Sequence, residues 1–216
     1  MAAQTFTVTN NGNTQTSTAL SKFYGSSGLF DGTGDFLDIT PTTDFALPSD
    51  FTIEAWAYNP ALTNLAIFSI GSYTTGLYFR IGEGADSTRA TVYINNSQIA
   101  LSASGSVKAA QWNHFAVVRS GSAVNIYVNG VSIASGTSSY SIPAATTYVG
   151  RAVHSTGEDM NGYVQDVRVY KGVAKYTSSF NPPSSTANPT VAAGNDSLVD
   201  SPTNYGTDTG VGGEVR

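Results

Sequence analysis

Two pairs of short alternating segments, each joined by a two-residue turn, constrain the fold more than any other feature of this sequence. Residues 124–128 and 131–133 flank an Asn129-Gly130 pair. Asn-Gly is the preferred pair for a type I′ turn because both central residues need a positive φ. A two-residue loop pairs Val128 with Val131 and predicts one shared face for five residues: Val124, Ile126, Val128, Val131 and Ile133. Alternation and turn chemistry therefore predict the same β-hairpin.

Residues 91–94 and 97–101 repeat this pattern around an Asn95-Asn96 pair. Here Tyr93 and Gln98 are expected to point away from a face shared by Val92, Ile94, Ile99 and Leu101. Further strands are predicted at 35–39, 51–58, 65–69, 77–81, 112–119, 147–150 and 162–170. No segment has the period of a long amphipathic helix. The sequence predicts an all-β fold, a two-sheet antiparallel jelly-roll sandwich.

The composition excludes several classes of function. The chain has no cysteine, which excludes disulfides, a thiolate metal site and a Cys nucleophile, and its 2 histidines leave little room for a His-rich site. A formal net charge of -5 argues against a nucleic-acid partner. No segment approaches the ~20 apolar residues that span a bilayer, and the N-terminus lacks the pattern of a signal peptide. We therefore expect no nucleic acid and no membrane insertion.

Four segments, in order within residues 28–171, resemble concanavalin A-like, laminin G-like (LamG) domains. They are LFDGTGDFLDI at 29–39, FTIEAW at 51–56, WNHFAVVR at 112–119 with IYVNG at 126–130, and GYVQDVRVY at 162–170. The resemblance implies the concanavalin A-like version of the jelly roll. Trp56 and Trp112 are expected to pack in its core.

Two further stretches resemble parts of bacteriophage virion proteins. Residues 171–183 resemble the tail of LamG modules in such proteins, and residues 5–12 are similar to the start of phage fibre-type proteins. Residues 196–206 resemble a lead-in to a following module. We expect an N-terminal arm with a short strand at 1–27, a LamG-like sandwich at 28–187, and an extended C-terminal arm or linker to a further module at 188–216.

The resemblance implies a non-enzymatic structural or adhesion protein of a phage virion: a fibre, spike or head-decoration component. It would be made in the host cytoplasm and displayed on the surface of the extracellular particle. Its expected partners are other virion proteins, copies of itself in a trimer, and a host-surface glycan. The alternative is a free-standing carbohydrate-binding module, although polar arms on both sides of one sandwich favour the virion component.

Catalysis is not expected. Retaining glycosidases of this superfamily place two carboxylates about 5–5.5 Å apart. Here the glutamates at 54, 83, 158 and 214 are isolated from one another in sequence. A degenerate glycosidase is therefore the least favoured hypothesis.

A structural calcium ion is the one cofactor that the resemblance implies. In the similar closing strand of family-16 laminarinases, an Asp at the place of Asp166 holds calcium together with backbone carbonyls, and Asp31 is the nearby second candidate here. Calcium requires hard oxygen ligands of this kind. The competing interpretation is that Asp166 pairs with Arg168, since residues two apart point to the same face of a sheet.

Four residues are candidates for carbohydrate binding: Tyr78, Arg80, Arg151 and His154. Tyr78 and Arg80, together with Tyr93, offer apolar surface with polar handles on the outward side of predicted strands. Arg151 and His154 lie in the loop at 151–161, where charge concentrates, and loops on rigid sheets often carry function. The alternatives left open are half-buried outward residues and an ordinary solvated connection.

Overall fold

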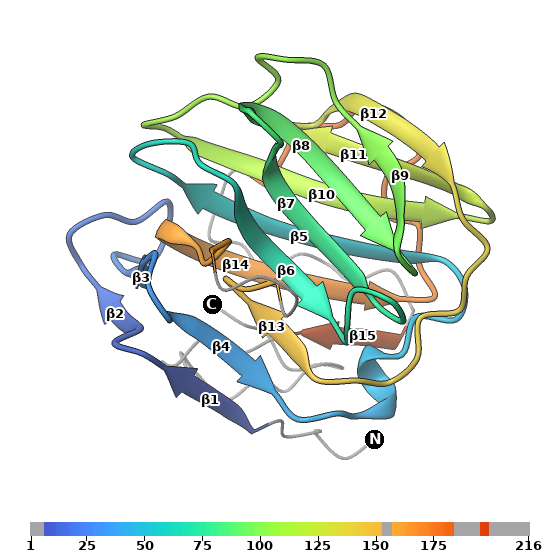
Figure 1. Ribbon diagram of the computed structural model, residues 1–216, viewed down its shortest axis with the longest axis horizontal. Coiled ribbons are helices and arrows are strands. Elements are labelled where there is room, and N and C mark those ends of the chain that lie inside the picture. Colours follow the sequence, from blue (N-terminus) through green and yellow to red (C-terminus); the bar gives the residue numbers. More distant parts are fainter. Residues whose placement is uncertain (1–6, 153–156, 184–194, 199–216) are drawn as a thin grey trace.

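The computed structural model describes residues 7–152, 157–183 and 195–198, which form two antiparallel sheets packed face to face (Figure 1). These residues contain fifteen strands and one short 3-10 helix, η1 (Thr43–Phe45). Within the described part of the chain, no helix has the length and apolar character needed to cross a membrane. The predicted all-β jelly-roll sandwich is confirmed.

One sheet has seven strands, which lie in the order β1-β4-β13-β6-β7-β8-β9. Their bounds are β1 (Val8–Asn11), β4 (Phe36–Ile39), β13 (Thr147–Val149), β6 (Leu65–Ile70), β7 (Leu77–Glu83), β8 (Asp86–Ile94) and β9 (Ser97–Leu101). This sheet carries the candidate site on the face turned away from the core.

The other sheet has eight strands, seven of them in the order β12-β11-β10-β5-β14-β3-β2. Their bounds are β12 (Val131–Thr137), β11 (Ala123–Val128), β10 (Trp112–Ser120), β5 (Phe51–Tyr58), β14 (Asn161–Lys171), β3 (Ser27–Asp31) and β2 (Gln15–Ser17). The eighth, β15 (Asn195–Leu198), pairs with the end of β14. Strands β1 and β2 of the predicted N-terminal arm are thus paired members of the two sheets.

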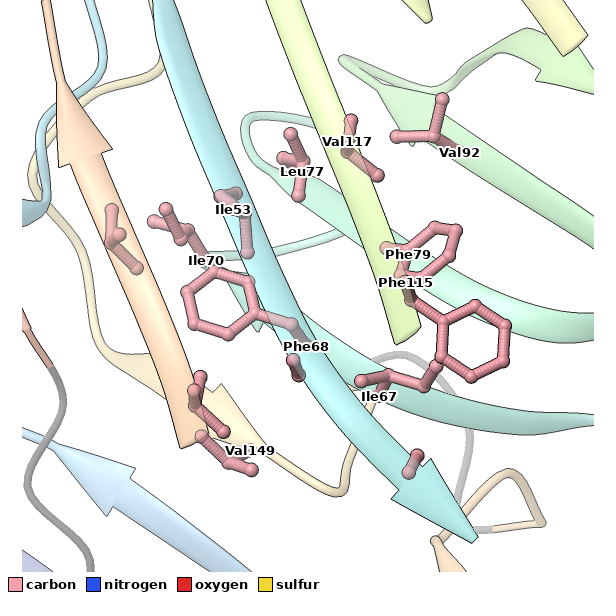
Figure 2. Packing of buried hydrophobic residues seen from close by; sticks show 14 of the residues in the cluster. Ile53, Ile67, Phe68, Ile70, Leu77, Phe79, Val92, Phe115, Val117 and Val149 are labelled. Atoms are coloured by element: carbon pink, nitrogen blue, oxygen red, sulfur yellow. The ribbon is translucent and has the colours of Figure 1, made fainter. Parts of the chain in front are cut away.

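The core lies between the sheets and is built from the inward-facing residues, which alternate with outward-facing ones along each strand (Figure 2). Phe79 of β7 and Phe115 of β10 meet across the gap with ring centroids 5.9 Å apart. Ile53, Phe68 and Val117 are each no more than 3% exposed. Both sheets therefore bury one complete face against the other.

The hairpin around Asn129 and Gly130 forms the expected turn, with φ of 50° and 79° at these residues. Val128 pairs with Val131 as predicted. A register shift between Ile126 and Tyr127 then changes the alternation. Val131 shares the face of Val128 as predicted, but its side chain is 57% exposed. β12 is an edge strand, so its first residue has a neighbouring strand on one side only.

The hairpin around Asn95 and Asn96 also has positive φ at both turn residues, 50° and 62°. A register shift between Val92 and Tyr93 places Val92 opposite Ala100. Ala100 consequently takes the core position that the sequence predicts for Leu101, which lies opposite Thr91. Tyr93 still points to the outer face, as expected.

The outer face of the eight-stranded sheet is covered by residues 172–183, which we call the strap. Tyr176 and Phe180 of the strap stack on each other and pack against Ala116, Val118 and Tyr127. Trp56 also lies on this outer face rather than in the core. It is 6% exposed and contacts the rings of Phe23 and His114. The expectation that Trp56 packs between the sheets is therefore wrong, although the side chain is buried.

Glu54 of β5 binds two side chains of the strap. Its side chain is 1% exposed and its carboxylate accepts hydrogen bonds from Lys175 Nζ at 2.8 Å and Tyr176 Oη at 2.7 Å. His114 Nε2 lies 3.4 Å from the same carboxylate. Burial by itself would raise the pKa of Glu54, but His114 and Lys175 outweigh it and hold the pKa well below its ordinary value.

Candidate functional site

A row of side chains crosses the outer face of the seven-stranded sheet at right angles to the strands. The register places Tyr148 opposite Ser69, Ser69 opposite Tyr78, Tyr78 opposite Tyr93, and Tyr93 opposite Gln98. Neighbouring strands lie about 4.8 Å apart. The row therefore sets aromatic and polar groups side by side, on strands whose alternate residues pack in the core.

Three tyrosines form a stack at the β7–β8 end of this row. The rings of Tyr78 and Tyr93 are parallel within 6°, with centroids 4.7 Å apart. Tyr73, from the turn before β7, lies 5.5 Å from Tyr78 and 5.9 Å from Tyr93. Tyr78 is 4% exposed, whereas Tyr73 and Tyr93 are partly exposed. Tyr73 and Tyr93 thus present aromatic surface to solvent, and Tyr78 supports them.

Arg80 lies beside the tyrosines on β7 and joins two carboxylates that are far apart in sequence. Its Nη2 donates to Glu83 Oε2 at 2.6 Å, and its Nη1 donates to Glu158. Its guanidinium carbon lies 5.7 Å from the centroid of the Tyr93 ring. We call Tyr73, Tyr78, Tyr93, Arg80, Glu83 and Glu158 the tyrosine face.

Hydrogen bonds connect the tyrosine stack to these charges. Tyr93 Oη donates to Glu83 Oε2 at 3.0 Å and accepts from Gln98 Nε2 at 2.9 Å. Burial raises the pKa of Tyr93, and its hydrogen bond to Glu83 raises it further. Burial also raises the pKa of Tyr78. Both phenols therefore keep their protons at neutral pH, and that of Tyr93 is donated to Glu83.

The Arg80 charge is fixed by its partners. Burial alone would lower the pKa of Arg80, but its hydrogen bond to Glu83 and the charges of Glu158 and Glu83 raise the pKa overall. Arg80 is 7% exposed, and both of its terminal nitrogens donate to protein carboxylates.

The charged loop between β13 and β14 lies on the same face. Ser69 Oγ donates to the carbonyl of Arg151 at 2.7 Å, and the amide of Ala66 donates to the carbonyl of Glu158 at 2.8 Å. Arg151 pairs with Asp159 at 2.8 Å, and its guanidinium lies 3.8 Å from the Phe36 ring centroid. These described parts of the loop separate the Tyr148 end of the row from the tyrosine face.

The predicted carbohydrate-binding residues divide into three groups. Tyr78 and Arg80 lie together in the tyrosine face. Arg151 is connected to it through its partner Asp159, which follows Glu158 directly. His154 lies outside the described residues. Sequence reasoning missed Tyr73, Glu83 and Glu158, whose place depends on a turn and a returning loop.

The two residues proposed for calcium are not brought together. Asp166 lies 3% exposed at a register shift in β14 and accepts from Arg168 Nε at 2.9 Å and Nη2 at 2.7 Å. Asp31 is exposed opposite Asn161, roughly 17 Å along β14 at about 3.4 Å per residue. No cluster of three or more metal-binding side chains occurs among the described residues. This arrangement does not favour calcium at the pair, which stays a prediction.

Comparison with protein families and solved structures identifies the fold family. A family profile described as the concanavalin A-like lectin/glucanases superfamily matches residues 31–178. Comparison with curated proteins gives no significant match.

Three similar solved structures share the fold at low sequence identity. Domain 4 of an extracellular arabinanase from Geobacillus stearothermophilus, solved with arabinotriose, is 17% identical with a TM-score of 0.58, covering 79% of this chain and 84% of that one. Mouse laminin α1 domains LG4-5 are 19% identical with a TM-score of 0.52, covering 65% and 40%. The tailspike protein 2 enzymatically active domain of bacteriophage CBA120 is 13% identical with a TM-score of 0.58, covering 79% and 29%.

This chain thus spans less than half of the laminin and tailspike chains. The likenesses show the fold alone, but the family match covers more than half of the sequence. The protein therefore belongs to the concanavalin A-like lectin/glucanase superfamily.

Proposed function

We propose that the protein is a non-enzymatic carbohydrate-binding module and that the tyrosine face is its binding surface. The observation that carries this proposal is the stacked pair of Tyr78 and Tyr93, with Tyr73 packed beside it, on the outer face of the seven-stranded sheet. Aromatic rings supply rigid apolar area for the C–H face of a sugar, and their hydroxyls supply polar ends. Gln98 and Glu83 add hydrogen-bonding groups at the same place.

The fold family supports this proposal without fixing the ligand. The arabinanase domain was solved with arabinotriose, which shows that a domain of this fold takes an oligosaccharide. Binding sites of mostly preformed shape with a few placed polar groups are the usual form of small-ligand sites. The tyrosine face has such placed polar groups in Glu83 and Gln98.

We propose no catalytic activity because of the hydrogen-bond partner that Glu83 and Glu158 share. Glycoside hydrolysis needs one protonated carboxyl group and one free carboxylate. Here Glu83 and Glu158 both accept hydrogen bonds from the guanidinium of Arg80. The pair therefore holds Arg80 rather than providing an acid and a nucleophile.

Glycan binding by purified protein tests the proposal. We expect Tyr93→Ala and Tyr73→Ala to weaken binding of an array-identified glycan at least tenfold, which corresponds to about 1.4 kcal/mol. Tyr163→Ala is the matched control, because this partly exposed tyrosine lies on the other sheet. Equal weakening by Tyr163→Ala, or unchanged binding by both variants of the tyrosine face, would contradict the proposed surface.

A second candidate is a component of a phage virion, a fibre, spike or head-decoration protein that binds a host-surface glycan and assembles with copies of itself, as a trimer, and with other virion proteins. The similarity of its fold to a domain of a bacteriophage tailspike protein supports this setting. Mass spectrometry of purified particles tests it, and detection of the chain is the expected result. Light scattering of the purified protein tests the trimer.

A further inference from the structure

The ion pairs of the tyrosine face and its surroundings carry an excess of negative charge. Arg80 pairs with Glu83 and Glu158, Arg89 pairs with Asp86 at 3.0 Å, and Arg151 pairs with Asp159. Three guanidinium groups thus stand against four carboxylates, a balance of three minus four, or one net negative charge. A ligand at this surface therefore lies close to more carboxylate groups than guanidinium groups.

Arg80 is the cation closest to the stack, and it is not available to an acidic ligand. Both of its terminal nitrogens donate to protein carboxylates, and the residue is 7% exposed. A carboxylate or sulfate on a ligand would have to displace Glu83 or Glu158 and leave that group unpaired. Leaving a desolvated charge without its partner is strongly unfavourable.

The remaining polar groups suit hydroxyls. The Glu83 carboxylate accepts from Arg80 and Tyr93 through Oε2 and lies at the edge of the face, where its side chain is 23% exposed. Gln98 is exposed and carries both a donor and an acceptor. A sugar hydroxyl can donate to the Glu83 carboxylate, and it can donate to or accept from the Gln98 amide. An anionic group could only accept from the Gln98 amide.

We propose that the tyrosine face selects uncharged sugars and excludes acidic ones such as uronic acids, sialic acids and sulfated sugars. This inference rests on the carbohydrate-binding function proposed above and names the ligand class of the same surface. Its basis is the Arg80 guanidinium shared by Glu83 and Glu158 beside two partly exposed tyrosine rings.

Calorimetric titration with size-matched neutral and uronic acid oligosaccharides tests the selection. We expect the neutral member of each pair to bind at least about tenfold tighter, because one net charge a few ångströms away repels the acid. Raising the salt concentration from about 0.05 M to about 0.5 M should increase the affinity for the uronate, since screening weakens repulsion. Glu83→Gln should reduce the ratio of the neutral-sugar affinity to the uronate affinity several-fold.

Asp50→Asn is the matched control for Glu83→Gln. It removes the same charge from the chain, but Asp50 lies before β5 on the other sheet and accepts from the Gly121 amide. We expect Asp50→Asn to leave the ratio of neutral-sugar to uronate affinity unchanged. Equal or tighter binding of the uronates would overturn the selection and leave carbohydrate binding standing. Failure of every neutral and acidic glycan to bind would overturn both.

Discussion

Removing the Glu54 carboxylate is the sharpest test of what holds the strap on the sheet. Glu54→Ala leaves Lys175 and Tyr176 without their shared acceptor and removes the negative charge nearest to Arg168 Nη1, which is 3.9 Å away. Arg168 keeps Asp166 as its partner. Lys175, whose side chain is 25% exposed, can turn toward water.

The expected loss of unfolding free energy follows from the partners of Glu54. Breaking a buried charge pair by removing one member costs about 3–5 kcal/mol. Because Lys175 can be resolvated and Arg168 stays paired, we expect the lower end, about 3 kcal/mol of unfolding free energy. A loss of this size is a large part of the total stability of a domain, which is about 5–15 kcal/mol.

Urea unfolding followed by tryptophan fluorescence measures the loss, since Trp56 contacts His114, which in turn contacts Phe180 of the strap. Trypsin cleavage after Lys175 provides a second measurement, which should become faster in Glu54→Ala than in the wild type. Arg89→Ala is the control, and its pair with Asp86 is about one-third exposed, so a smaller loss is expected. A loss below about 1 kcal/mol in Glu54→Ala, with unchanged cleavage, would refute the anchoring role.

The same carboxylate predicts a pH dependence. The pKa of Glu54 is lower in the folded protein than its ordinary value of about 4.3. The stabilisation from Glu54 is therefore complete above that ordinary value and is lost as the pH falls through the lower folded pKa. In Glu54→Gln, stability should fall less steeply on acidification, as measured by urea unfolding at a series of acidic pH values.

Three further changes have expected outcomes. Arg119→Lys should cost about 3 kcal/mol in urea unfolding, since a buried guanidinium that donates to the carbonyls of Leu47, Ser49 and Tyr140 is replaced by a single ammonium point. Phe79→Ala should cost about 3–5 kcal/mol, because the ring fills the gap between the sheets. Gly136→Ala should lower the melting temperature, because an added Cβ would lie 1.8 Å from the Ile99 carbonyl.

The strands and turns were predictable because their signals are local. Both two-residue turns have the expected positive φ, and the predicted strand at 51–58 coincides with β5. The register shift in each hairpin was not predictable, because it depends on neighbouring strands. Leu101 shows the consequence, since it lies opposite Thr91 and not on the face where simple alternation places it.

The candidate site was predictable only in part. Alternation along β7 and β8 places Tyr78, Arg80 and Tyr93 outward without reference to the rest of the chain. Glu158 reaches Arg80 because its loop returns over the sheet after β13, a contact across seventy-eight positions of sequence. No local pattern indicates such a contact. Trp56 shows the same limit, since its burial comes from segments far away along the chain.

The position of β14 has a consequence for how the protein folds during synthesis. β14 pairs with β5 along one edge and with β3 along the other, so these two strands are bridged only by it. Roughly 100 residues separate β5 from β14, and a ribosome needs about 5–20 s to add them. Until then β5 and β3 lack the strand that joins them. We therefore expect the eight-stranded sheet to be completed late, and expression to depend on protection of the open strand edges by chaperones.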